Sequence, residues 1–196
     1  MSLRAVSRRF SERFIYNARM NTSKNIILVG LMGAGKTTIG RQLARQLRRP
    51  FVDTDQLIES RTGVTIPWIF DLEGEAGFRR REREVIAEMC LQDNLVLATG
   101  GGSVLDPVNR EHLRRHGFVV YLQADVAVLF ERTKQDSHRP LLKTDDPREQ
   151  LQRLLAHRDP LYREVAHYTV DTGRTSVAKA VSSIAQAFHG DENDQR

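Results

Sequence analysis

Cysteine is almost absent from the 196-residue chain: Cys90 is the only one, so no disulfide can form within it. That usage fits a reducing compartment, and we expect a cytoplasmic protein. No run approaches the roughly eighteen apolar residues that a membrane-spanning helix needs. The six histidines show no metal-ligand spacing with one another or with Cys90, and no G-x-S-x-G signature is present. Neither a zinc site nor catalysis by a nucleophilic serine is therefore indicated.

The chain also lacks a strong charge of either sign outside its first segment. Residues 1–20 hold five arginines and one glutamate, a net charge of +4, which leaves only +1 of the total of +5 for the rest. A nearly neutral body does not favour a nucleic-acid partner. We expect residues 1–20 to be a disordered leader or an extension before a start at Met20. An organelle-targeting peptide, which would also be rich in arginine, is the alternative.

Apolar and amphipathic segments alternate along the remaining residues. Ile39, Leu43 and Leu47 recur at four-residue spacing, which predicts an amphipathic helix over 36–47. Short strands separated by helices predict an α/β sandwich with a mostly parallel sheet. We expect one domain over 21–190 and a disordered tail over 191–196. The expected strands are 25–29, 51–52, 95–98, 118–122 and 167–170, and two further helices are expected over 107–115 and 176–188.

A phosphate-binding motif lies between the first expected strand and the helix over 36–47. Residues 30–37 read GLMGAGKT and match G-x-x-x-x-G-K-[ST]. In this context the glycine-rich backbone wraps phosphates, Lys36 reaches the β- and γ-phosphates, and the Thr37 hydroxyl binds Mg²⁺. A glycine-rich turn with an exposed lysine is the alternative, but it does not explain the flanking elements. The predicted ATP-binding residues are Gly30, Gly33, Ala34, Gly35, Lys36, Thr37 and Thr38.

Two carboxylates, Asp53 and Asp55, follow the second expected strand. Parallel α/β sheets bind their ligands beyond the carboxyl ends of strands. Residues two apart on an extended segment point the same way, so one carboxylate would face Mg²⁺ and the other an acceptor hydroxyl. Alternatively, Asp55 only caps a helix that begins at Gln56.

Arginines and glycines form the next candidate groups. Residues 79–83 contain four arginines in a helical stretch, and one face cannot hold them all. One of them could bind a substrate anion, and spacing alone does not select it. Gly100, Gly101 and Gly102 follow the third expected strand, which favours a loop that closely approaches a ligand over a simple tight turn.

A polar stretch over 134–140 and the segment 158–163 are candidates for a lid and its neighbour. A basic lid would bring a cation onto the transferring phosphoryl group and exclude water. An ordinary surface loop is the alternative.

Together these segments resemble one family. From Asn25 to about Phe188 the chain resembles bacterial shikimate kinases, especially those of γ-proteobacteria. The Walker loop is common to other kinases, whereas the remaining motifs separate this family from gluconate, adenylate and guanylate kinases. The leader before Met20 is the one departure. The shared motifs, in the family's order and spacing, are GLMGAGKTTIG at 30–40, DTD at 53–55, FR at 78–79, GGG at 100–102, RPLL at 139–142 and R-x-P-L-Y at 158–162.

The resemblance implies a three-layer α/β sandwich with a five-stranded parallel sheet, like that of nucleoside monophosphate kinases. It places a substrate-binding subdomain near 54–82 and a lid near 134–146. The implied activity is ATP-dependent phosphorylation of the 3-hydroxyl of shikimate to shikimate 3-phosphate, in chorismate and aromatic amino-acid biosynthesis. The implied partners are ATP and shikimate, with no nucleic acid or membrane, and a monomer is expected by analogy alone.

The resemblance also assigns residues to the acceptor. Arg79 and Arg158 would hold the shikimate carboxylate, and Asp55 would hold ring hydroxyls. The implied substrate-binding positions are Asp55, Arg79, Gly100, Gly101, Gly102 and Arg158.

On the nucleotide side, the resemblance places Arg132 against adenine and the lid residue Arg139 on the ATP phosphates. Asp53 falls on a position associated with one Mg²⁺ ion, usually through water. The predicted mechanism is in-line phosphoryl transfer, in which Lys36, Asp55 and Arg139 are the catalytic residues. Two alternatives are a kinase for another polyol acid such as gluconate and a nucleotide-binding module without catalysis.

Overall fold

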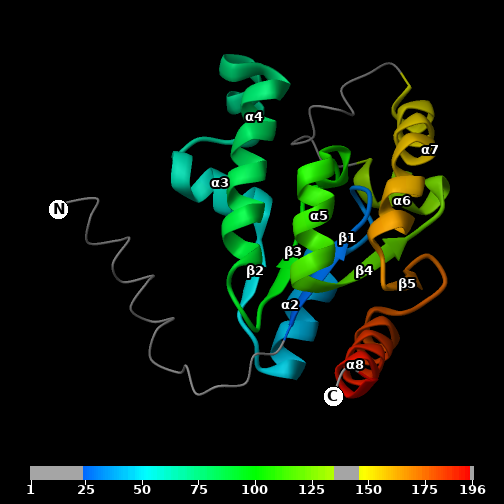
Figure 1. Ribbon diagram of the computed structural model, residues 1–196. Coiled ribbons are helices and arrows are strands. Elements are labelled where there is room, and N and C mark those ends of the chain that lie inside the picture. Colours follow the sequence, from blue (N-terminus) through cyan, green and yellow to red (C-terminus); the bar gives the residue numbers. More distant parts are fainter. Residues whose placement is uncertain (1–23, 135–145, 195–196) are drawn as a thin grey trace.

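A parallel five-stranded sheet forms the centre of the molecule (Figure 1). The computed structural model describes residues 24–134 and 146–194, and all structural statements refer to these residues. The expected α/β sandwich is confirmed, with the strands in the order β2-β3-β1-β4-β5. The strands are β1 (Asn25–Val29), β2 (Phe51–Asp53), β3 (Val96–Ala98), β4 (Gly117–Gln123) and β5 (Tyr168–Asp171).

The central strand β1 has partners on both sides. Ile27 is in register with Leu97 of β3 and with Val119 of β4, and all three side chains are fully buried. Helices cover both faces of a parallel sheet, so such a strand is apolar throughout rather than at alternate positions. This explains why the continuous run at 25–29 was enough to predict β1.

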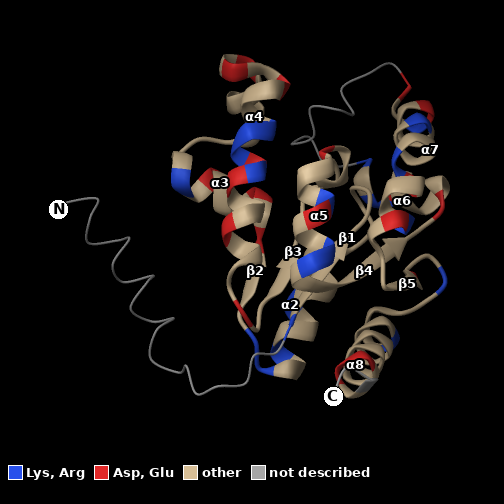
Figure 2. Ribbon diagram, in the orientation of Figure 1, with Lys and Arg blue, Asp and Glu red and all other residues tan. Residues whose placement is uncertain are grey.

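Helices cover the two faces of the sheet. α2 packs against α8 on one face, whereas α5 packs against α4 and α7 on the other. Acidic and basic residues are interspersed along α4 and α5 (Figure 2). No described helix is long and apolar enough to cross a membrane. The helices are α2 (Lys36–Leu47), α3 (Thr54–Thr62), α4 (Ile66–Cys90), α5 (Pro107–His116), α6 (Val126–Thr133), α7 (Pro147–Val165), α8 (Val177–Asp194) and the short 3-10 helix η1 (Ser103–Leu105).

One expected boundary, at the C-terminal end, is changed by tertiary contacts. The disordered tail predicted from Asp191 is wrong for 191–194, because α8 continues to Asp194. Ion pairs hold this last turn: Lys24 lies 3.5 Å from Asp191, and Arg49 lies 3.9 Å from Glu192. The leader over 1–20 and most of the expected lid lie outside the described residues.

One glycine divides the long helix α4. Gly74 has φ 67° and ψ −179°, which is not helical, and it interrupts an otherwise regular helix. The first half, with Ile66 and Phe70, extends beyond the sheet, whereas the second half packs into the core through Val85 and Ile86. The expected subdomain boundary at residue 82 therefore falls inside a helix and stays a prediction.

Gly117→Ala is expected to destabilise the fold. A Cβ at Gly117 would lie 2.5 Å from Ile27 Cδ1 and 3.0 Å from the Asn25 carbonyl oxygen, both in the central strand. Overpacking of this kind costs about 1–3 kcal/mol of unfolding free energy. Urea unfolding should show a lower midpoint with an unchanged slope. Gly190→Ala is the control, because a Cβ there meets nothing within 4 Å, and an equal loss in both variants would contradict the packing argument.

Candidate active site

A cavity of about 740 Å³ lies at the carboxyl ends of the strands and collects most of the predicted site residues. Two predicted residues are not among its lining. Gly30 directly follows β1 and is not part of the lining, and Arg139 lies outside the described residues. The predicted residues that line the cavity are Gly33, Ala34, Gly35, Lys36, Thr37, Thr38, Asp53, Asp55, Arg79, Gly100, Gly101, Gly102, Arg132 and Arg158.

The glycine-rich loop turns sharply out of β1 and into α2. Gly30 has φ +143°, and a Cβ there would lie 2.5 Å from the Leu122 carbonyl oxygen of β4. Only glycine accommodates both the backbone angle and this close approach. α2 begins at Lys36, whose ammonium donates to the carbonyl oxygens of Gly30 at 2.7 Å and Leu31 at 3.0 Å. The loop thus directs a helix N-terminus and a lysine into the cavity, an arrangement that binds phosphate.

Arg132 and Thr172 hold the outer side of the loop. Arg132 donates to the carbonyl oxygens of Gly33 at 3.2 Å and Thr172 at 2.7 Å. The Thr172 hydroxyl donates a hydrogen bond to the carbonyl oxygen of Ala34 at 3.1 Å. Arg132 lines the cavity, and its guanidinium also ties α6 to the loop. Thr172 was missed, since nothing in the sequence marks its hydroxyl beyond its position at the end of a strand.

Asp53 caps a helix and contacts the loop at the same time. Its Oδ1 accepts from the backbone N–H groups of Asp55 at 3.2 Å and Gln56 at 3.4 Å. Its Oδ2 accepts from the Thr37 hydroxyl at 2.8 Å. The alternative that Asp55 caps the helix is wrong, because α3 already begins at Thr54 and Asp53 is its N-cap. The extended geometry expected over 53–55 is wrong for the same reason.

Asp55 is buried in the first turn of α3 and points into the cavity. Its Oδ1 has no hydrogen-bond partner among the described residues. Burial, together with the nearby Asp53 and Glu82, raises the pKa of Asp55 to about 7, although Lys36 and Arg79 oppose the rise. A Cβ at Gly100 would lie 2.7 Å from Asp55 Oδ1 and 2.6 Å from Glu82 Oε1. The absence of a side chain at Gly100 therefore lets two carboxylates approach one another.

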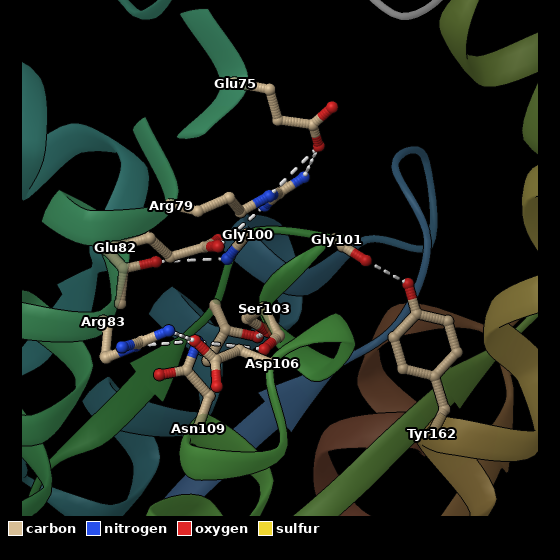
Figure 3. Close-up of polar contacts among 12 residues, drawn as sticks. Glu75, Arg79, Glu82, Arg83, Gly100, Gly101, Ser103, Asp106, Asn109 and Tyr162 are labelled. Atoms are coloured by element: carbon tan, nitrogen blue, oxygen red, sulfur yellow. Dashed lines mark hydrogen bonds and ion pairs between the residues drawn. The ribbon is translucent and has the colours of Figure 1, made fainter. Parts of the chain in front are cut away.

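The structure selects Arg79 from the arginine cluster. Arg79 donates to the buried Glu82 at 2.7 Å and to Glu75 at 2.9 Å, and its guanidinium lines the cavity (Figure 3). A Cβ at Gly102 would lie 2.3 Å from this guanidinium. The other three arginines pair elsewhere, Arg80 and Arg81 with Glu73, and Arg83 with Asp106.

Arg158 completes the charged wall of the cavity. It extends from α7 and is only 4% exposed, and its Nε has no hydrogen-bond partner among the described residues. Burial raises the pKa of Glu82, while Arg79 and then Arg158 lower it, so both arginines lie near one carboxylate. Two guanidinium groups on one wall of the cavity, one of them with a donor that has no partner among the described residues, suit a carboxylate ligand. Glu82 was missed in the sequence, although its position three residues after Arg79 on a helix was a usable signal.

This combination of a parallel sheet, a phosphate-binding loop and a second anion-binding wall defines the class of P-loop kinases that act on small molecules. The family model described as "Shikimate kinase" matches residues 32–189. The chain therefore belongs to the shikimate kinase family.

Relatives and solved structures agree with this assignment. The chain is 57% identical to a shikimate kinase of Methylococcus capsulatus over 169 residues, which cover 86% of this chain and 94% of that one. It is 58% identical to a shikimate kinase of Burkholderia pseudomallei over 160 residues, covering 82% of this chain and 87% of that one. The shikimate kinase of Acinetobacter baumannii, solved in complex with shikimate, superposes with a TM-score of 0.84 at 50% identity, covering 87% of this chain and 95% of that one.

Asp55→Asn is expected to stabilise the ligand-free protein above pH 7. The pKa of Asp55 is raised from 3.8 to about 7, so its contribution to stability is full below pH 3.8 and is lost as the pH rises through 7. Asparagine carries no buried charge, so the variant should be more stable at pH 8 by about 1–3 kcal/mol, with a difference that shrinks toward pH 5. Urea unfolding across this pH range measures it. The exposed Asp93→Asn controls for loss of one negative charge, and a pH-independent difference for Asp55→Asn would contradict the assignment.

Proposed function

We propose that the chain transfers the γ-phosphate of ATP to the 3-hydroxyl of shikimate, forming shikimate 3-phosphate for aromatic amino-acid biosynthesis. The observation that carries the proposal is the position of Asp55. Asp55 lines the same cavity as Lys36 at the phosphate-binding end and Arg79 at the anion-binding end, and both of these cations lower its pKa. An acceptor whose carboxylate lies on the arginines would then present a ring hydroxyl to Asp55 and the phosphate.

The nucleotide half of the reaction depends on positioning. The backbone of Gly33, Ala34 and Gly35 would surround the phosphates, and Lys36 would exchange its contacts with the loop carbonyls for the β- and γ-phosphates. Arg132 would lie beside the adenine while bracing the loop from outside. Arg139 stays a predicted lid residue.

Thr37 and Asp53 are the proposed magnesium-binding residues. A hydroxyl and a carboxylate 2.8 Å apart beside the loop are oxygen donors of the type that Mg²⁺ prefers. Both carboxylate oxygens of Asp53 already accept hydrogen bonds from the protein, which favours contact through water rather than direct ligation. The ion, when bound, supplies neutralisation of the phosphate charge.

The acceptor half assigns separate roles to three side chains. Arg79 and Arg158 would hold the carboxylate, and the glycine loop at 100–102 would let it approach the backbone. Asp55 would accept a hydrogen bond from the 3-hydroxyl, orienting it for in-line attack and receiving its proton as the bond to phosphorus forms. A raised pKa suits this role, because the ideal base titrates near the operating pH.

No observation favours a second function. A gluconokinase of Sinorhizobium meliloti superposes with a TM-score of 0.61 at 17% identity, which reflects the shared fold alone. Location in the cytoplasm and a monomeric state stay predictions.

Arg79→Ala should abolish efficient use of shikimate. The assay is ADP release in the presence of ATP and Mg²⁺, with shikimate, quinate, gluconate or no acceptor. Loss of a charged hydrogen-bonding anchor should lower kcat/KM for shikimate about 10- to 100-fold. The KM for ATP should stay within about twofold, because the arginine lies away from the phosphate loop. Arg80→Ala is the matched control, since Arg80 is exposed and, among the described residues, pairs with Glu73 alone. Turnover of gluconate but not shikimate by the wild type would refute the proposed acceptor.

Asp55→Asn should reduce turnover far more than nucleotide affinity. Loss of a group that orients the hydroxyl and accepts its proton typically costs about 100-fold or more in kcat. The dissociation constant for ADP should change little, because the backbone of the glycine-rich loop, and not Asp55, would surround the phosphates. Steady-state kinetics and a titration with ADP measure the two quantities, and near-normal turnover would remove Asp55 from the mechanism.

A further inference from the structure

Tyr162 is a fully buried phenol that the proposed mechanism does not use. It lies on α7, one helical turn after Arg158, and its hydroxyl donates to the Gly101 carbonyl oxygen at 2.5 Å (Figure 3). Burial raises the pKa of Tyr162, while the adjacent Arg158 lowers it. A single neutral hydroxyl therefore contacts the glycine loop and lies against one of the two arginines of the charged wall.

A second tyrosine fixes the ring of Tyr162. The rings of Tyr121 and Tyr162 stack with their centroids 5.0 Å apart. The Tyr121 hydroxyl donates to Asp159 at 2.8 Å, and Asp159 in turn accepts from Arg163 at 2.7 Å. Since Tyr121 belongs to the buried strand β4, the position of Tyr162 is set by the sheet rather than by the cavity.

The glycine loop needs such an anchor. Three consecutive glycines have no side chains to pack and lose more backbone entropy on ordering than other residues. Gly100 is held through its N–H by the Thr54 hydroxyl, and the Gly102 carbonyl accepts from Leu105. Among the described residues, only Tyr162 donates to the carbonyl of Gly101, the middle residue.

Fixing this carbonyl also fixes the next N–H group. In a trans peptide the carbonyl of one residue and the N–H of the next point in opposite directions. The Gly101 carbonyl points to Tyr162, so the Gly102 N–H faces away from it, and within the described residues that N–H donates to no protein acceptor. An anion held by Arg158 would find an unpaired donor from the loop beside it.

We propose that Tyr162 is a positioning residue for the acceptor's carboxylate: its hydroxyl holds the Gly101 peptide and Arg158 in fixed relation before the substrate binds. The inference rests on the proposed function, and it adds a residue that touches neither substrate. The proposal predicts that loss of the Tyr162 hydroxyl weakens binding of the acceptor's carboxylate and leaves binding of ATP unchanged.

Tyr162→Phe removes the hydroxyl and keeps the stacked ring, and Tyr121→Phe is the matched control because it removes a buried hydroxyl one ring away. Loss of one hydrogen bond should raise the KM for shikimate roughly five- to tenfold in Tyr162→Phe. The kcat and the KM for ATP should stay within about twofold. For a shikimate analogue with CH₂OH in place of the carboxylate, the two variants should have similar KM values. Melting temperatures of both variants report on their folding.

Hydrogen exchange provides a readout without turnover. Amides over residues 101–104 should exchange faster in Tyr162→Phe than in Tyr121→Phe, while β1 and β4 exchange alike. A KM for shikimate within twofold of the wild type, an equal rise for the analogue, or unchanged exchange in this segment would each overturn the proposal. If the wild type turns over no shikimate, the proposed function fails, and exchange of the loop still tests whether Tyr162 positions it.

Discussion

The parallel pairing of β1 with β3 and β4 is the constraint on which the site depends. It brings the carboxyl ends of the strands to one edge, so the segments that follow β1, β2 and β3 converge on a single cavity. These segments carry the phosphate loop, Asp53 with Asp55, and the three glycines. The pairing also places Gly30 against the Leu122 carbonyl, so the direction in which the phosphate loop leaves the sheet is set by backbone contact.

Charge balance in the cavity follows from this convergence. Arg79 and Arg158 share one buried carboxylate, Glu82, and Arg79 also pairs with the more exposed Glu75. Asp55 lines the same cavity as these arginines and Lys36, and burial makes its ionised form costly. Keeping this carboxylate in the cavity therefore lowers the free energy of unfolding at neutral pH, a cost that is common at functional sites.

Most of the sheet and the phosphate loop could be predicted, because buried parallel strands and glycine-rich loops have local signatures. The side-chain network could not. The choice of Arg79 over Arg80 depends on which face of α4 turns toward the cavity, and the cap at Asp53 depends on where α3 begins. The hydroxyl of Thr172 contacts Ala34, 138 positions away, and that of Tyr162 contacts Gly101, 61 positions away, so no local pattern predicts these two contacts. The helical turn at 191–194 likewise depends on ion pairs with distant residues.

The two halves of α4, which Gly74 separates, line different parts of the cavity. The outer half supplies Ile66 and Phe70 to the apolar side of the cavity, and the inner half supplies Arg79 and Glu82 to the charged side. The halves are nevertheless coupled across Gly74, because the ring of Phe70 packs 5.0 Å from that of Phe78 and Glu73 pairs with Arg81 at 2.6 Å. One helix thus lines the cavity with two chemically different surfaces, and a shift of the apolar segment would be felt by the segment that carries the arginine.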